Sequence, residues 1–492
     1  MVAEGGTDGR VEWFTAPEQW LSRLVMQRAL AVVYVLAFLS AALQFRALLG
    51  SHGILPVPRF VAAVPFRAAP SLFQWHYSDR FFAGVAWCGV ALAAAVAAGA
   101  ADLVPLWAGM LMWAALWALY LSIVNVGQLW YGFGWESLLL EAGFLAIFLG
   151  NARTAPPILV LWLLRWLLFR VEFGAGLIKW RGDRCWRELT CLYYHHETQP
   201  MPGPLSWYFH HLPRRAHRME VAANHVTQLA VPFALFLPQP AAGAAAALMI
   251  VTQLWLVLSG NFAWLNWLTI VLALSALDSS PVTEPRAYAD PPSWFLALVC
   301  AVTVLVVVLS YRPVRNLLSR RQQMNRAFDS LHLVNTYGAF GSITRVRHEV
   351  IIEGTAVTPQ EGAGEGGTDG GWREYGFRGK PGDVRRLPRQ WAPYHLRLDW
   401  QLWFAALAPA RSLGWLSGLV SRLLTNDPAT LRLLRDNPFP TEPPAYVRVS
   451  LYRYRYTTRR ERRETGEWWH RVWVRELLPP VGRDARDPTR GP

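Results

Sequence analysis

Long apolar runs in the first part of the chain constrain its fold more than any other feature. Between residues 29 and 311, stretches of about 20 mostly apolar residues recur, and each is long enough to cross a bilayer as a helix. Helices are required because lipid cannot satisfy the backbone N–H and C=O groups. The sequence therefore predicts an α-helical polytopic membrane bundle over residues 29–311, preceded by an N-terminal segment, residues 1–28, that lacks a signal peptide pattern.

The positions of these runs predict about nine spans. They are residues 29–45, 81–100, 104–125, 133–150, 156–178, 217–237, 242–259, 262–278 and 293–311. The segments 133–150 and 262–278 are short or carry polar residues. Tryptophan, with 26 residues in the chain, suits the two membrane–water interfaces of such a bundle.

A change of composition after residue 311 predicts a second part. Residues 312–330 are expected to form a basic amphipathic connector helix. Residues 331–492 are expected to form a smaller soluble C-terminal domain that is mostly β, with a small sandwich as its architecture. Residues 343–352, 445–451 and 467–477 have the pattern of strands, and Asp427-Pro428 has the pattern of a helix start. Residues 362–371 are glycine-rich and are expected to form a flexible loop.

The chain carries a net charge of +14, almost entirely from arginine, since lysine occurs only at Lys179 and Lys380. We expect no nucleic-acid partner from this balance. We expect instead that basic residues lie near anionic lipid headgroups. Counted near the span ends, arginines would place the tail in the cytoplasm.

Three ionisable residues lie in the fifth predicted span. Arg165, Glu172 and Lys179 are seven residues apart, so they share one stripe of a helix at intervals of about 10 Å and need partners from other helices. Lys179 has two interpretations: a cation that reaches the headgroups, or a desolvated base, since lysine loses its proton more readily than arginine.

Polar residues of two other spans are the expected partners. Glu136 and Glu141 lie on the fourth span, and Glu220 and Asn224 share a stripe of the sixth. We expect Glu136 or Glu141, together with Glu220, to neutralise the arginines of the fifth span. The sequence does not decide whether this network is structural or part of a functional site.

The polar loop 180–215 is the chemically densest stretch. Its distinctive residues are Arg181, Asp183, Cys185, Trp186, Cys191, His196 and Glu197. The six-residue spacing of the two cysteines fits no common zinc pattern, whereas on an oxidising side of the membrane they would form a disulfide. His195 and His196 beside Cys191 fit a packed loop, so we expect neither a metal nor a cofactor.

These segments carry a family resemblance. The blocks are residues 176–191, 196–202, 220–232, 259–268, 333–341, 375–382 and 393–400. Together they run over most of the chain and resemble the signature of the lipase maturation factor family. The family's membrane domain is distantly similar to that of the vitamin K-dependent carboxylase.

The resemblance implies a multi-pass endoplasmic reticulum protein that assists folding and assembly of secreted lipases through a lumenal C-terminal domain. It therefore contradicts the arginine count on orientation, and we follow the resemblance. The composition looks bacterial, which makes a bacterial cytoplasmic membrane the other location. A chaperone-like factor is favoured over an enzyme, with the exposed aromatics of the tail, such as Trp468, Trp469 and Trp473, contacting the client. The alternative is a membrane enzyme for a lipid-soluble or peptide substrate, with Lys179 as its base.

Overall fold

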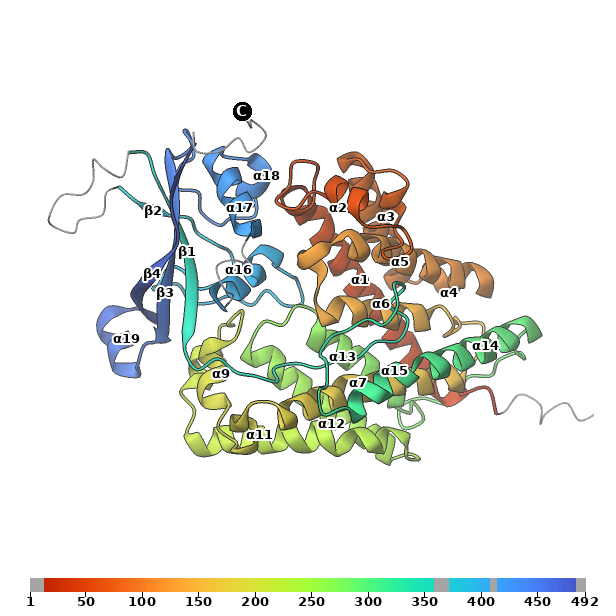
Figure 1. The fold of residues 1–492 in the computed structure, drawn as a ribbon. Helices are drawn as coiled ribbons and strands as arrows, with labels where there is room; N and C mark the ends of the chain where they lie inside the picture. Colours follow the sequence, from red (N-terminus) through yellow and green to blue (C-terminus); the bar gives the residue numbers. More distant parts are fainter. Residues whose placement is uncertain (1–12, 358–370, 408–413, 484–492) are drawn as a thin grey trace, which may run out of the picture.

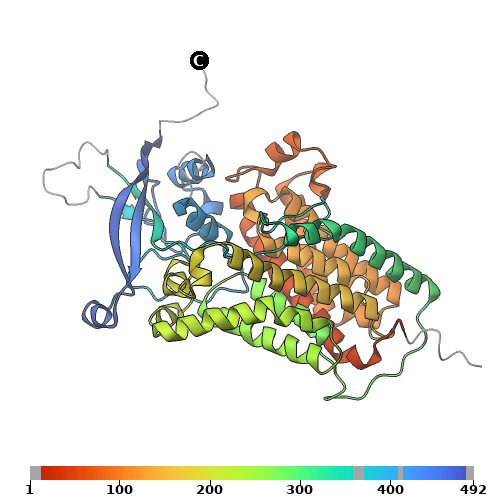
Figure 2. The same cartoon turned by 60° about the horizontal axis from the view of Figure 1, so that its bottom comes forward.

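The computed structural model describes residues 13–357, 371–407 and 414–483. Two parts lie side by side (Figure 1). We call residues 13–318 the helical part and residues 347–483 the sheet part, and the segment between them, residues 319–346, the crossover. Turned by 60°, the molecule shows the sheet at one side with short helices between it and the helical part (Figure 2).

Every predicted span corresponds to helix, with different ends. The helices at the predicted positions are α1 (Trp20–Leu48), α3 (Asp79–Ala98), α5 (Leu106–Val126), α6 (Gly134–Ala146), α7 (Ile158–Arg181), α11 (Arg214–Leu229), α12 (Ala241–Ser259), α13 (Leu265–Ala273) and α14 (Ser293–Leu309). Shorter helices join them: α2 (Val57–Ala63), α4 (Ala100–Leu103), α8 (Arg184–Arg187), α9 (Leu192–Thr198), α10 (Ser206–His210) and α15 (Tyr311–Leu318). Helix α1 begins within the expected N-terminal segment.

The expected count of about nine spans is not confirmed. Five segments of the described chain are long and apolar enough to cross a membrane: Pro17–Leu48, Asp79–Ala98, Leu106–Val126, Ala241–Ser259 and Ser293–Leu318. Helices α6 and α13 have only 13 and 9 residues. Helix α7 is long enough but carries several charged residues, and α11 begins with Arg214 and Arg215. The helical part is thus of membrane type, with shorter or more polar helices packed among the spans.

The connector helix is shorter than expected. Helix α15 ends at Leu318, and a basic helix over residues 312–330 is therefore wrong. The crossover then returns along the helical part, where Val334, Asn335 and Tyr337 are buried. Residue 331 is consequently not a point at which the chain leaves the helices.

The sheet part contains one antiparallel sheet. Its strands are β1 (Arg347–Thr355), β2 (Arg373–Glu374), β3 (Tyr446–Tyr456) and β4 (Trp469–Gly482), in the order β2-β1-β3-β4. The three predicted strand regions are confirmed. So is the helix start at Asp427, whose carboxylate accepts from Thr430 N at 2.8 Å. Of the predicted loop 362–371, all but Gly371 lies outside the described residues.

Helices, and not a second sheet, cover the inner face of this sheet. They are α16 (Arg397–Leu407), α17 (Gly414–Leu424) and α18 (Pro428–Leu431), which lie between the sheet and the helical part (Figure 1). Helix α19 (Arg459–Thr465) joins β3 to β4. The expectation of a sandwich is therefore wrong, because the sheet packs on helices, of which the sequence pattern indicated only the start of α18.

A buried ion pair joins the two parts. Arg397, the first residue of α16, donates to Glu136 of α6 at 2.6 Å and to the carbonyl of Trp130 at 2.7 Å, and neither charged side chain is exposed. The guanidinium lies 3.5 Å above the ring of Tyr131. A buried carboxylate without its cation is strongly unfavourable, so the sheet part is held against α6.

His395 lies in the same junction. Its ring is enclosed by the rings of Phe133, Trp135, Trp264 and Trp400, at centroid distances of 4.8, 5.2, 5.8 and 6.1 Å. Burial, with the charge of Arg397, lowers the pKa of His395 from 6.5 to about 4, against the opposing effect of Glu136. The imidazole is therefore neutral in the folded protein at pH 7.

Loss of the buried cation is expected to destabilise the protein. Arg397→Met leaves Glu136 buried and unpaired, which should lower the free energy of unfolding by about 3–5 kcal/mol in denaturant titrations in detergent. The double variant Glu136→Gln/Arg397→Met should recover part of the loss. Arg460→Met removes the exposed pair with Glu464 and should change the same quantity by less than about 1 kcal/mol. Equal effects of the buried and exposed changes would contradict this assignment.

Acidification should weaken the junction through His395. The pKa in the folded state lies below the unfolded value, so the contribution is present above about pH 6.5 and is lost as the pH falls toward 4. Between pH 7 and pH 5 this group should cost the wild type about 2 kcal/mol of unfolding free energy. Over the same interval the unfolding free energy of His395→Phe should fall by about 2 kcal/mol less than that of the wild type. The unfolding free energy of His470→Phe, a change at an exposed site, should fall as much as that of the wild type. Parallel curves for all three proteins would refute the interpretation.

Candidate functional site

Glu141 neutralises one arginine of α7. It pairs with Arg170, and its second oxygen accepts from Asn335 N at 2.9 Å and from the Tyr337 hydroxyl at 2.7 Å. Arg165 instead donates to the carbonyl of Ser275 at 3.1 Å. The network therefore differs from the expected one, because the crossover, which is distant in sequence, supplies most of the partners of Glu141.

Glu172 and Lys179 are connected through amide side chains. Glu172 accepts from Gln253 at 2.7 Å and from Gln228 at 3.0 Å. The oxygen of Gln228 accepts from Lys179 Nζ at 2.8 Å, and Asn224 Oδ1 lies 3.5 Å from the same nitrogen. Lys179 is buried, and it binds the neighbouring helix α11 instead of reaching outward.

Loop 180–215 holds the crossover in place. Cys185 and Cys191 form a disulfide, and Asp183 caps α8 and pairs with Arg345 at 3.1 Å. Arg181 donates to the carbonyl of Leu317 at 2.8 Å. Trp186 donates to the carbonyl of Phe340, also at 2.8 Å. Since Cys191 is in the disulfide, it is not a thiolate ligand beside His195 and His196.

The same loop also holds the sheet. Glu197, in α9, accepts from the backbone N–H of Tyr456 in β3 at 2.8 Å. Arg347, at the start of β1, donates to the carbonyls of Glu197 at 2.8 Å and Gln199 at 2.5 Å. The disulfide-bonded loop and the sheet therefore lie on the same side of the helical part.

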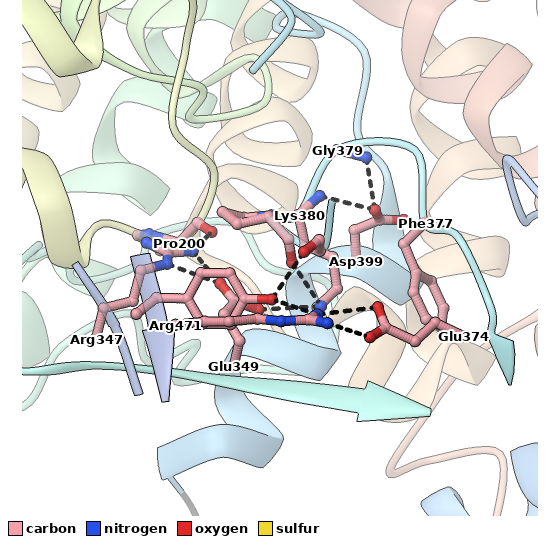
Figure 3. Close-up of polar contacts among 12 residues, drawn as sticks. Pro200, Arg347, Glu349, Glu374, Phe377, Gly379, Lys380, Asp399 and Arg471 are labelled. Carbon is pink, nitrogen blue, oxygen red and sulfur yellow. Dashed lines mark hydrogen bonds and ion pairs between the residues drawn. The ribbon is translucent and has the colours of Figure 1, made fainter. Parts of the chain in front are cut away.

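Residues 375–382 line a cavity of about 260 Å³ in the sheet part. The charged residues around it are Glu374, Arg378, Lys380, Asp383, Arg386, Arg389, Arg435 and Asp436. Figure 3 shows Lys380, Glu349 and Arg347 directed toward one another beside this loop, with Arg471 and Glu374 paired next to them.

The polar groups beneath the cavity are buried. Glu349 is fully buried between Arg347 and Lys380, whose Nζ lies 3.1 Å from its carboxylate. Asp399 accepts from Gly379 N at 2.7 Å and from Lys380 N at 3.0 Å, which fixes the loop (Figure 3). Burial raises the pKa of Asp399, and these two N–H bonds oppose the rise. The cluster shapes the loop and its cavity.

Sequence reasoning missed Arg347, Glu349 and Asp399 as parts of this cluster. They come from three segments that the fold brings together, and no spacing rule connects them. The available signals were two distinctive blocks: 375–382, which supplies Lys380 and the backbone N–H groups that Asp399 binds, and 393–400, which contains Asp399.

Comparisons with known proteins agree with one another. The family model described as the lipase maturation factor transmembrane domain matches residues 21–284, and that of the lipase maturation factor C-terminal domain matches residues 333–479. The chain is similar to lipase maturation factor 1 of Homo sapiens, with 41% identity over 95% of this chain and 89% of the relative. For the Bos taurus protein the identity is 40%, over 96% and 91%.

A third relative is more distant and matches a similar share of this chain. Lipase maturation factor 2 of Homo sapiens is 29% identical over 95% of this chain and 83% of its own length. No solved structure matches. Because one family model covers more than half of the chain and relatives at about 40% identity cover nearly all of it, the chain belongs to the lipase maturation factor family.

Proposed function

We propose that this membrane maturation factor assists the folding and assembly of secreted lipases. The observation that carries the proposal is the agreement over both parts of the chain with proteins named for lipase maturation. The enzyme alternative has less support, because the relatives are named as maturation factors. In addition, Lys179, its expected base, is bound by two amide side chains of the neighbouring helix α11.

Strand β4 is the surface that best suits an unfinished client. It is the last strand in the order, and no strand of the described chain pairs with its outer side. Val472, Trp473 and Val474 are 42%, 55% and 40% exposed. Of the aromatic residues considered from the sequence, Trp469 is fully buried and Trp468 is half-buried, which leaves Trp473 for contact.

The chemistry of an edge strand fits this task. Its free N–H and C=O groups pair with any extended chain, and exposed apolar side chains add affinity without strict sequence preference. A lipase that has not completed its own sheets or its subunit contact exposes both extended backbone and apolar surface. We therefore propose that such a segment adds to β4 until the lipase buries it.

The contact between the loop and the sheet supports one orientation in the membrane. Because loop 180–215 contacts β1 and β3, the disulfide and the sheet share one side of the membrane. Disulfides persist on the oxidising side. We propose that this side is the lumen of the endoplasmic reticulum. The named relatives are vertebrate proteins, and the comparisons give no support to the bacterial membrane. The arginine count, which predicted the cytoplasm, fails for long segments.

A charge on β4 should impair maturation. Val474→Glu places a carboxylate on the proposed client surface, and the loss of about 1 kcal/mol of binding corresponds to an approximately fivefold weaker interaction. In cells that lack their own maturation factor, lipase secreted with the variant should have less activity per lipase molecule than lipase secreted with the wild type. Val346→Glu is the matched control, since Val346 is 43% exposed before β1. Wild-type yields from Val474→Glu at equal expression would contradict the client surface.

Thiol labelling should locate the loop. With Cys88 and Cys300 replaced by serine, the remaining cysteines are the disulfide pair Cys185 and Cys191. In sealed microsomes an impermeant maleimide should label the chain only after both reduction and permeabilisation. Labelling of unreduced protein would exclude the disulfide, and labelling without permeabilisation would place the loop in the cytosol.

A further inference from the structure

Three side chains that the lipase-maturation proposal does not use converge between α9 and α11. His196 comes from α9, whereas His217 and Glu220 are three residues apart on α11 and so share one face of that helix. One ligand atom from each lies within 4.8 Å of the others. The two helices are adjacent in Figure 1.

The groups are directed at one another without forming hydrogen bonds. Glu220 Oε2 lies 3.9 Å from His196 Nε2 and 3.7 Å from His217 Nδ1, both beyond hydrogen-bond length. All three of these atoms are buried and lack a hydrogen-bond partner within the described chain. Buried polar atoms in this state are rare and call for a ligand.

Surrounding contacts fix the ligand geometry. Trp255 of α12 donates to the other carboxylate oxygen of Glu220, which leaves Oε2 directed at the imidazoles. The second nitrogen of His217 lies 3.4 Å from the carbonyl of His210. Such outer partners orient imidazole and carboxylate ligands in metal sites. The ring of Phe209 covers His196 at 5.5 Å.

We propose that His196, His217 and Glu220 bind one divalent transition-metal ion, with zinc as the best match to two imidazoles and one carboxylate. Ligands at about 2.0–2.1 Å from a tetrahedral ion lie roughly 3.4 Å apart. The two carboxylate–imidazole distances, 3.7 and 3.9 Å, need to contract by only a few tenths of an ångström, and the two imidazole nitrogens, which lie within 4.8 Å of each other, by up to about 1.4 Å. The fourth position belongs to water.

The position of the ion gives it a structural role. It would fasten α9 to α11, and α9 carries Glu197, which binds the backbone of β3. The disulfide and the ion would then fix the two ends of the segment 185–197, whose last residue, Glu197, supplies one carbonyl partner of Arg347. The ion stabilises this support whether or not the client is a lipase.

Metal content of the full chain tests the site. The chain is purified in detergent with an affinity tag that lacks histidine, incubated with zinc, and freed of loose metal by gel filtration. Elemental analysis should give about one equivalent for the wild type and less than about 0.1 equivalent for His196→Ala, His217→Ala and Glu220→Gln. His211→Ala is the matched control, a neighbouring histidine outside the cluster, and should retain one equivalent.

A second set of measurements tests the site even if a variant folds poorly. Cobalt added to the wild type should give the visible absorption of a tetrahedral site, and zinc should displace that signal. Zinc should also raise the melting temperature of the wild type and leave that of the near-isosteric Glu220→Gln unchanged. Wild-type protein that retains less than about 0.1 equivalent and gives no cobalt spectrum would overturn the proposal. Equal metal in the wild type and all three variants would also overturn it.

Discussion

Glu136 and Glu141 are the two carboxylates that the arrangement of this molecule depends on. Both lie on α6 without exposure, and each takes its cation from elsewhere: Glu136 from Arg397 of α16, and Glu141 from Arg170 of α7. Replacing such pairs with apolar residues is often harmless, but removing one partner is costly. The pairs therefore determine which segments must lie together, even where they add little net stability.

This constraint explains why the chain does not divide cleanly into an anchor and a tail. The crossover binds Glu141 through Asn335 and Tyr337, and α16 binds Glu136 through Arg397. The loop that follows α7 forms hydrogen bonds through Glu197 with Arg347 of β1 and with the backbone of β3. A sheet held at several points presents β4 in a fixed position, which suits the client surface proposed there.

Sequence patterns predicted the elements better than their partners. Apolar runs located the helices, because burial in lipid and burial in protein select the same residues. For the same reason the predicted spans at α6, α7, α11 and α13 are not confirmed as spans. Alternation located β1, β3 and β4. Helices α16 and α17 were not predicted, because each is short and its apolar face can be recognised only when the sheet that it packs against is known.

The candidate sites show the same limit. The spacing of Arg165, Glu172 and Lys179 identified a polar helix. The residues that bind Glu172, Gln228 and Gln253, were not predicted as its partners, because they are neutral and a charge pattern does not include them. His196 and Glu220 were both singled out, and His217, which brings them into one cluster, was not. Partners from distant segments are set by the fold and have no local spacing rule.

Hydrogen exchange during denaturant titration tests most directly whether the helical and sheet parts form one cooperative body. If the buried pairs hold the two parts together as described, amides of α6, β1 and β3 should lose protection at the same denaturant concentration and with the same dependence on it. Loss of protection in β1 and β3 at a clearly lower concentration, while α6 remains protected, would show that the sheet opens independently and would contradict the account.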